Sequence, residues 1–250
     1  MASIRLVSLN IERALHLDTV LPFLKERKPD VCCLQELREP DIPRFLDALS
    51  MRHFAFVPMS IHPSEGHPAP TGLGILSRFP MDTHVHYYRG IAGSPPKTFD
   101  FPDSKSKFES EHAMVLFGTI HTGNTSYTIG TTHFGWTPNG KPDEYQRKDL
   151  AALLPILDAA GEFVLTGDFN APRGGEIFSE FARRYTDNIP LEYKTSIDLT
   201  LHRAARTKRN EIADKMVDGL FTTPAYTASN VSLEDGVSDH CAVVATIKKR

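Results

Sequence analysis

The sequence is poor in cysteine and has no long apolar run. It contains only three cysteines, and two of them, Cys32 and Cys33, are adjacent, so on a strand their side chains would point to opposite faces. An odd count with this spacing argues against a disulfide framework or a zinc site built from Cys pairs, and favours small buried side chains. No run approaches the roughly 18 apolar residues of a membrane helix, so we expect no membrane span.

The sequence also lacks a strong excess of charge of one sign. It has 28 Lys and Arg against 31 Asp and Glu, a net charge of −3. This balance argues against a protein that coats nucleic acid by bulk positive charge, although a local basic groove is compatible with it. Residues 1–10 do not form a signal-peptide pattern, and together with the scarcity of cysteine this predicts a cytoplasmic protein.

The composition is typical of a globular protein. Of the 250 residues, 40% are hydrophobic and 24% are charged, close to the averages for folded domains. A chain of this length buries enough surface to fold without disulfides or structural metals. We therefore expect one domain spanning residues 1–250, and a monomer.

Short strands and helices alternate along the chain. Apolar periodicity predicts strands near 4–10, 31–36, 53–60, 72–78, 82–89, 112–121, 126–133, 162–168, 215–222 and 241–248, and helices near 17–28, 42–49, 143–160 and 175–184. Pro155 is expected to bend or break the third of these helices. The stretch 90–111 shows no period and is expected to be a structureless loop, and 62–70 a turn-rich loop.

Successive strands are often joined without an intervening helix, which predicts mixed rather than purely parallel sheets in an α/β domain. Several of these strands end in carboxylate, carboxamide or imidazole side chains, and others contain or follow them. At strand ends lie Asn10, Glu12, Glu36, His133, Asp168 and Asn170; Asp218 lies within the strand 215–222, and Asp239 and His240 come just before the last strand. Each alone could simply end a strand or form a turn. Together they are the groups that hold hard metals and move protons. An oxygen-rich set suits Mg²⁺ or Mn²⁺ better than zinc, which points to phosphate-ester chemistry.

Seven short motifs carry a family resemblance. They are Leu9-Asn-Ile11, Leu34-Gln-Glu36, Gly74-Ile-Leu-Ser-Arg78, Thr132-His133, Gly167-Asp-Phe-Asn170, Val217-Asp-Gly-Leu-Phe221 and Ser238-Asp-His240. As an ordered set covering residues 9–240, they resemble the endonuclease/exonuclease/phosphatase superfamily, with its deoxyribonuclease-I-like fold. The resemblance implies a four-layer α/β sandwich, in which two mixed, mostly antiparallel sheets pack face to face with helices outside. It also implies a hydrolase that requires Mg²⁺ or Mn²⁺.

The resemblance implies a role for each matching residue. Glu36 would be the main metal ligand, with Asn10 beside it, Asp239 close to the metal and Glu12 near it. Asp168 would orient or deprotonate the attacking water, and Asn170 would hold that water or the phosphate. His240 would contact the phosphate, oriented by Asp218, and His133 would donate to the phosphate or leaving group.

The loops are expected to determine which substrate the protein selects. In 90–111, Lys97, Lys105 and Lys107 alternate with phenylalanines, which fits either a nucleic-acid grip or a lid with its rings packed inward. The segment 203–215 has a net charge of +3 and could meet a phosphate backbone or form an exposed charged hairpin. Trp136 could stack on a base or pack within its loop. His62 and His67 are expected to belong to a solvated loop rather than to a metal site.

Three hypotheses remain open at this point. The first is a phosphodiesterase acting on DNA or RNA, and the second is a hydrolase of small or lipid-linked phosphate esters. The third is a degenerate member of the family that only binds, which the intact acid, base and metal positions argue against. Apurinic endonucleases resembling exonuclease III carry an aromatic residue shortly before the aspartate that matches Asp218, where this chain has Lys215 and Met216. Specificity for abasic sites is therefore not expected.

Overall fold

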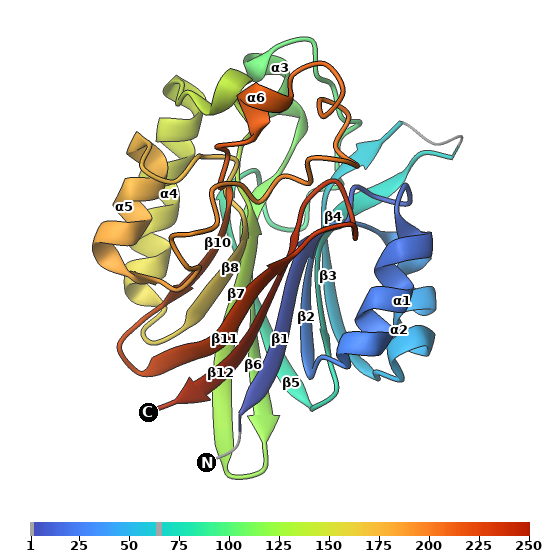
Figure 1. The fold of residues 1–250 in the computed structure, drawn as a ribbon, viewed down its shortest axis with the longest axis vertical. Coiled ribbons are helices and arrows are strands. Elements are labelled where there is room, and N and C mark those ends of the chain that lie inside the picture. The colour runs from blue at the N-terminus through green and yellow to red at the C-terminus, as the bar shows by residue number, and fades with distance from the viewer. Residues whose placement is uncertain (1–2, 64–66) are drawn as a thin grey trace.

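The computed structural model describes residues 3–63 and 67–250 (Figure 1). One group of strands is β1 (Ile4–Asn10), β2 (Val31–Arg38), β3 (His53–His62), β4 (Ala69–Ser77), β11 (Tyr226–Glu234) and β12 (Ala242–Lys249). The other is β5 (Met81–Arg89), β6 (Ala113–Thr122), β7 (Thr125–His133), β8 (Val164–Asp168), β9 (Thr186–Asp187) and β10 (Asp218–Thr222). The helices are α1 (Leu17–Arg27), α2 (Ile42–Leu49), α3 (Ser104–Ser110), α4 (Glu144–Ala159), α5 (Glu176–Arg184) and α6 (Arg209–Ile212), with short 3₁₀ turns at Glu39–Asp41 and Pro138–Gly140.

The strands form two mixed sheets. The first has the order β11-β12-β1-β2-β4-β3, and the second β5-β6-β7-β8-β10-β9. Each sheet has one parallel pair, β1 with β2 and β7 with β8, while the other neighbours are antiparallel. In both sheets the parallel pair brings the carboxyl ends of two strands to the same edge.

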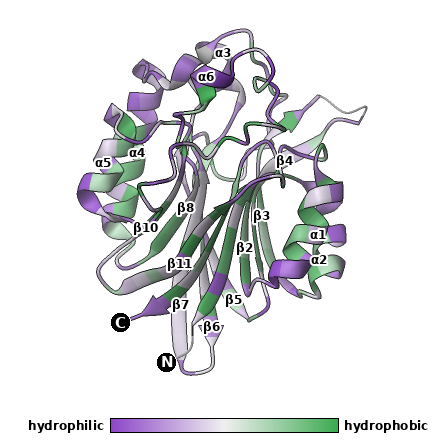
Figure 2. Ribbon diagram, in the orientation of Figure 1, coloured by the Kyte–Doolittle hydropathy of each residue, from purple (hydrophilic) through white to green (hydrophobic). Residues whose placement is uncertain are grey.

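The sheets pack face to face and helices cover their outer faces. Leu6 and Ile75 of the first sheet belong to the same buried cluster as Leu116 and Leu220 of the second. A separate cluster joins α1 and α2 to the first sheet, and another joins α4 and α5 to the second. These helix pairs lie on opposite sides of the molecule in Figure 1, and the strands between them are largely apolar in Figure 2. The predicted four-layer α/β sandwich is thus confirmed. No helix in the described ranges is long and apolar enough to cross a membrane.

Several local predictions are wrong. The stretch 90–111 is not structureless, because it contains α3, whose first turn is capped by the Asp103 side chain accepting from the Ser106 backbone N–H at 2.8 Å. The helix α4 continues through Pro155, so a break at this residue is wrong, while a bend there stays a prediction. The turn-rich loop is shorter than 62–70, because β3 reaches His62 and β4 begins at Ala69; its residues 64–66 lie outside the described residues.

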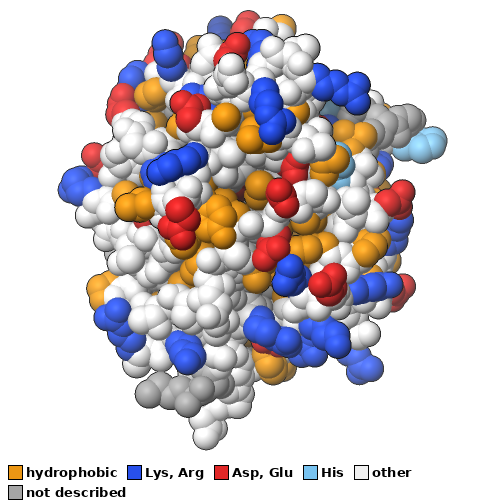
Figure 3. Space-filling view, in the orientation of Figure 1, with side chains coloured by type: hydrophobic (Ala, Val, Ile, Leu, Met, Phe, Trp, Pro, Cys, Tyr) orange, Lys and Arg blue, Asp and Glu red, His pale blue; other side chains and the backbone are white. Residues whose placement is uncertain are grey.

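The segment 203–215 is not a strand hairpin. It consists of turns and the short helix α6. Two of its lysines are paired within the segment, Lys208 with Glu211 at 3.4 Å and Lys215 with Asp214 at 3.5 Å. On the face shown in Figure 3, basic and acidic side chains are interspersed, so no large field of one sign covers it.

Gly167 lets β7 and β8 approach closely just before Asp168. It has a φ of +138°, and an added Cβ would stand 2.0 Å from the carbonyl oxygen of Thr132 on β7. We expect Gly167→Ala to lower the free energy of unfolding by about 2–4 kcal/mol, measured by urea denaturation, because backbone strain and a backbone clash add. Gly93→Ala is the control, because its φ is +79° but its added Cβ meets nothing within 4 Å. Equal losses in the two variants would contradict the role assigned to the close approach.

Candidate active site

The strand ends of the two sheets meet at one edge of the sandwich. Within the second sheet, Asp168 pairs in register with His133 of β7 and with Asp218 of β10. From the first sheet, Asn10 at the end of β1 donates its amide N–H to Asp168 Oδ2 at 3.2 Å. This hydrogen bond links the two sheets, so side chains 158 positions apart in the sequence share one centre.

A cavity of about 530 Å³ opens over this centre. It is lined by every candidate residue of the sequence analysis except Asp218: Asn10, Glu12, Glu36, His133, Asp168, Asn170, Asp239 and His240. Its outer walls include Lys107 of α3 and Arg203 and Lys208 of the segment before α6. The two loops that the sequence left undecided therefore both border the cavity.

Asp168 is the most densely contacted carboxylate of this centre. It is buried, and its Oδ1 accepts the backbone N–H of Asn170 at 2.8 Å. His133 Nε2 and His240 Nε2 lie 3.4 and 3.7 Å from Oδ2. Burial alone would raise the pKa of Asp168, but the charge of His240 and the hydrogen bonds from His133 and Asn170 hold that pKa well below its ordinary value. Asp168 is therefore held as a carboxylate, with two imidazole nitrogens and a backbone N–H beside it.

His240 is oriented by Asp218, which lies behind it. Its Nδ1 is 2.7 Å from Asp218 Oδ2, so the carboxylate fixes the ring and leaves Nε2 facing Asp168. The Ser196 hydroxyl accepts the backbone N–H groups of Val217 and Asp218 at 3.0 Å each, which fixes the start of β10. Burial would lower the pKa of His240, but the charges of Asp218 and Asp168 outweigh it and hold that pKa well above its usual value.

His133 and Asn170 complete the second-sheet half of the site. Burial disfavours the charged form of His133, but its hydrogen bond to Asp168 and the nearby Glu36 carboxylate raise its pKa overall. Asn170 adopts a φ of +49° and donates its side-chain N–H to the Phe134 carbonyl at 2.9 Å. The strained left-handed backbone and this hydrogen bond hold the turn after β8 in one conformation.

Glu36 lies on the first-sheet side of the cavity and has a partner that the sequence analysis did not single out. Its φ is +55°, and its Oε1 accepts from the Asn10 amide at 3.4 Å. Arg13 donates to its Oε2 at 2.5 Å and also lies 3.7 Å from Glu12. Burial would raise the pKa of Glu36, but the charges of His133 and Arg13 lower it overall. Glu36 is therefore a carboxylate in the state that binds cations.

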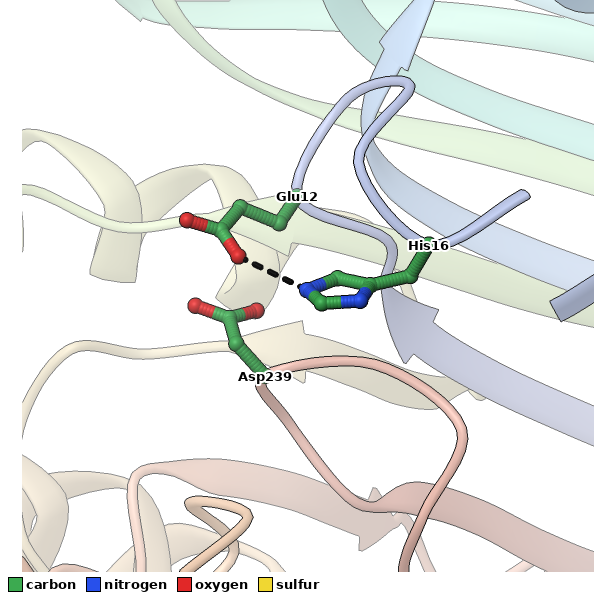
Figure 4. A group of neighbouring side chains, drawn as sticks. All are labelled: Glu12, His16 and Asp239. Atoms are coloured by element: carbon green, nitrogen blue, oxygen red, sulfur yellow. Dashed lines mark hydrogen bonds and ion pairs between the residues drawn. The ribbon is translucent and has the colours of Figure 1, made fainter. Parts of the chain in front are cut away.

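Glu12, Asp239 and His16 form a group of three potential metal ligands (Figure 4). The sequence analysis did not single out His16. His16 Nε2 is 3.0 Å from Glu12 Oε2, and one potential ligand atom from each of the three lies within 4.8 Å of the others. His16 follows Glu12 by four residues in the turns before α1, so this spacing gave no signal without the conformation of that loop.

The donor set fits a divalent cation. Asp239 is only 7% exposed, and the one hydrogen bond to its carboxylate from a described residue comes from the neighbouring Ser238 hydroxyl at 3.3 Å. Burial raises the pKa of Asp239 to about 7, and the charges of Glu12 and Glu36 add to this although His240 opposes it. A buried carboxylate with other carboxylates nearby is stabilised when a cation neutralises them.

Comparisons with known proteins agree with this architecture. Among solved structures, an endonuclease/exonuclease/phosphatase from Beutenbergia cavernae matches with a TM-score of 0.72 at 20% identity, covering 100% of this chain and 72% of that one. D. rerio TDP2, complexed with single strand DNA product, matches with a TM-score of 0.68 at 15% identity over 100% of both chains. The catalytic domain of human Nocturnin, with a bound sulfate anion, matches with a TM-score of 0.65 at 17% identity over 99% of this chain and 95% of that one.

At these identities the structural matches show the fold alone, and no curated protein sequence matches the chain. The family assignment comes from the sequence. The family model described as Endonuclease/Exonuclease/phosphatase family matches residues 7–240, from β1 to the Ser-Asp-His turn before β12. Members of this family are phosphoric ester hydrolases. The chain therefore belongs to the endonuclease/exonuclease/phosphatase family.

Proposed function

We propose that the protein is a divalent-metal-dependent phosphodiesterase that hydrolyses phosphodiester bonds in nucleic acid by means of an activated water. The observation that carries this proposal is the surroundings of Asp168. A buried, ionised carboxylate lies within 3.7 Å of two imidazole nitrogens, and the same cavity is lined by Glu12 and Asp239, which with His16 could hold a cation. Hydrolysis of a phosphodiester needs this combination, a base for water and positive groups for the developing charge.

Each residue of the site has its own role in the proposed hydrolysis. Asp168 accepts the proton of the attacking water, and Asn170 positions that water or a phosphate oxygen. His240, held by Asp218, and His133 donate hydrogen bonds to the phosphate and to the leaving oxygen. Glu36, Asp239 and Glu12 hold the cation, while Asn10 keeps Glu36 and Asp168 in place through its two amide hydrogen bonds. A bound Mg²⁺ or Mn²⁺ supplies Lewis-acid stabilisation of the phosphoryl oxygens.

A second candidate function is hydrolysis of small or lipid-linked phosphate esters. The observation in its favour is the cavity, whose volume of about 530 Å³ falls within the range of small-molecule pockets, roughly 300–1,000 Å³. The partial pairing of the basic side chains in 203–215 also reduces the charge available to a long phosphate backbone.

A substrate panel separates the two functions. Single- and double-stranded DNA, RNA, inositol phosphates and a chromogenic diester would each be assayed with Mg²⁺ and with Mn²⁺. We expect cleavage of nucleic acid, with binding that weakens as salt rises because several phosphates are contacted. A clear preference for a small ester, without any cleavage of nucleic acid, would reject the first function in favour of the second.

Loss of the Glu36 carboxylate should weaken cation binding. We expect Glu36→Gln to reduce the affinity for Mn²⁺ by about 10–100-fold, because even outer partners of metal ligands have effects of this size. Isothermal titration calorimetry of the apoprotein with Mn²⁺ measures it without reference to turnover. Glu180→Gln, which changes a carboxylate paired only with Arg183 among the described residues, should bind Mn²⁺ as the wild type does. Unchanged affinity in Glu36→Gln would remove Glu36 from the cation site.

A further inference from the structure

Four aromatic rings stand in a row along one wall of the cavity. His62 stacks on Phe99 with centroids 4.8 Å apart, Phe99 stacks on Phe101 at 5.8 Å, and Phe101 meets Trp136 edge to face at 4.9 Å. They come from β3, from the loop before α3 and from the loop after β7. All four line the same cavity as Asp168 and His240. The row therefore borders the same cavity as the reaction centre.

Hydrogen bonds hold the loop that carries Trp136, which lies at one end of this row. Trp136 follows His133 by three residues, and the loop between them is held by Gln146, whose side chain donates to the Gly135 carbonyl at 2.8 Å. Asn170 donates to the Phe134 carbonyl in the same loop. Because Asn170 belongs to the phosphate centre and also holds this loop, the indole has a defined position relative to that centre.

Contacts within the protein do not fully bury the aromatic rings of this row. Phe101 is 38% exposed, one of few large apolar side chains so exposed in the described chain. A lid whose rings served only to close the structure would bury them. The exposed Phe101 ring, with the half-buried rings of His62, Phe99 and Trp136 along the same cavity, instead suits a ligand that brings a flat face.

The charges beside the row indicate the rest of that ligand. Lys107 Nζ lies 5.5 Å from the centroid of the Phe101 ring and 3.8 Å from Glu111. Arg203 also lines the cavity, and no described residue forms a hydrogen bond or ion pair with it. A ligand with a planar ring next to a phosphate matches aromatic and basic groups in this arrangement, whereas an inositol or sugar phosphate has no planar ring to stack.

We propose that this aromatic row is a base-binding subsite, which holds the nucleobase of a nucleotide or strand end while its phosphate lies at Asp168 and His240. The proposal rests on the proposed phosphodiesterase function and narrows its substrates to those with a base next to the scissile phosphate. The cavity volume suits one nucleotide rather than a stretch of duplex. Phe101 and Trp136 are then the residues that distinguish nucleotides from other phosphate esters.

The sequence supplies a direct probe, because Trp136 is the one tryptophan in the chain. Adenosine 5′-monophosphate, ribose 5-phosphate and inositol 1-phosphate would be titrated while its fluorescence is recorded, in an Asp168→Asn background so that the esters are not consumed. We expect the nucleotide to quench the indole and to bind about 5–150-fold more tightly than the two esters without a base, as stacking on an aromatic side chain provides. Adding Phe101→Ala should remove most of that difference.

The matched control is Phe54→Ala, which removes an exposed phenylalanine (48%) of β3 that does not line the cavity; it should leave nucleotide affinity unchanged. Equal affinity for the three esters, or a nucleotide preference unaffected by Phe101→Ala, would overturn the subsite.

Hydrolysis of a chromogenic diester by the wild type, measured in parallel, tests the phosphodiesterase function separately. Hydrolysis without a nucleotide preference rejects only the subsite, whereas a nucleotide preference without hydrolysis of any ester in the panel rejects only the proposed function.

Discussion

Replacing Asp168 with Asn is expected to lower kcat by about 10²–10⁴-fold, because the attacking water loses its proton acceptor. The carboxylate is buried and its low pKa keeps it ionised at neutral pH, whereas an amide of the same shape cannot take a proton. The affinity for the cation should change much less, because Glu36, Glu12 and Asp239 remain. Steady-state kinetics at saturating Mn²⁺, with nucleic acid or a chromogenic diester as substrate, measure the effect.

The matched control is Asp158→Asn, an exposed carboxylate paired with Arg184 at 3.1 Å on the outside of the molecule. It should retain wild-type turnover. Circular dichroism and thermal unfolding would establish that Asp168→Asn is folded, since Asp168 also accepts the hydrogen bond from Asn10 between the sheets. Full metal-dependent activity in a folded Asp168→Asn or Asp168→Ala protein would refute the assignment of Asp168 as the base.

The position of Asp168 in the site could be predicted, because the end of a strand can be recognised from the sequence pattern. The segment Val164–Asp168 is short and begins with two apolar residues, as a buried strand can, and polar side chains at strand ends are expected to gather at a sheet edge. Strands joined without helices predicted mixed sheets, whereas the packing of two sheets face to face was implied only by the family resemblance. The contacts across the sheets could not be derived this way, because the Asn10–Asp168 hydrogen bond depends on how the sheets pack.

The elements that the sequence analysis missed have weak local signals. The strand β11 (Tyr226–Glu234) is an edge strand with few buried side chains, so it lacks a clear apolar alternation. The helix α3 is only seven residues long and polar, and its start depends on the Asp103 cap rather than on an apolar face. Pro155 did not break α4; its ring lies on the exposed side of the helix, while Leu153 and Leu157 are buried beside it.

Arg13 and His16 show the limit of motif reasoning at the site itself. Neither belongs to a motif that carried the resemblance, and both lie in the loop after β1, where Glu12 and Arg13 have positive φ values of 44° and 62°. That loop conformation turns both residues toward the acidic cluster, Arg13 to Glu36 and His16 to Glu12. Residue type and spacing suggest such a contact only after the turn is known.

Replacing His240 with Asn should lower kcat about as severely as replacing Asp168, by about 10²–10⁴-fold. His240 Nε2 faces Asp168 from 3.7 Å, so it is placed to hydrogen-bond the same phosphate that the activated water attacks. Its raised pKa keeps the ring protonated at neutral pH, and this charge is lost in the variant. The matched control is His121→Asn, which removes an imidazole paired with Asp82 at 2.8 Å on the protein surface and should leave kcat unchanged.

The Asp218→Asn variant tests whether Asp218 acts by positioning His240 rather than by contacting the substrate itself. Asp218 does not line the cavity and acts through the 2.7 Å bond to His240 Nδ1, so we expect a smaller loss, about 10–100-fold in kcat with little change in KM. In the double variant with His240→Asn, the Asp218 change should add little, because its only route to the substrate is already gone. Full additivity of the two losses would show that Asp218 acts independently, and the orienting role assigned to it would be wrong.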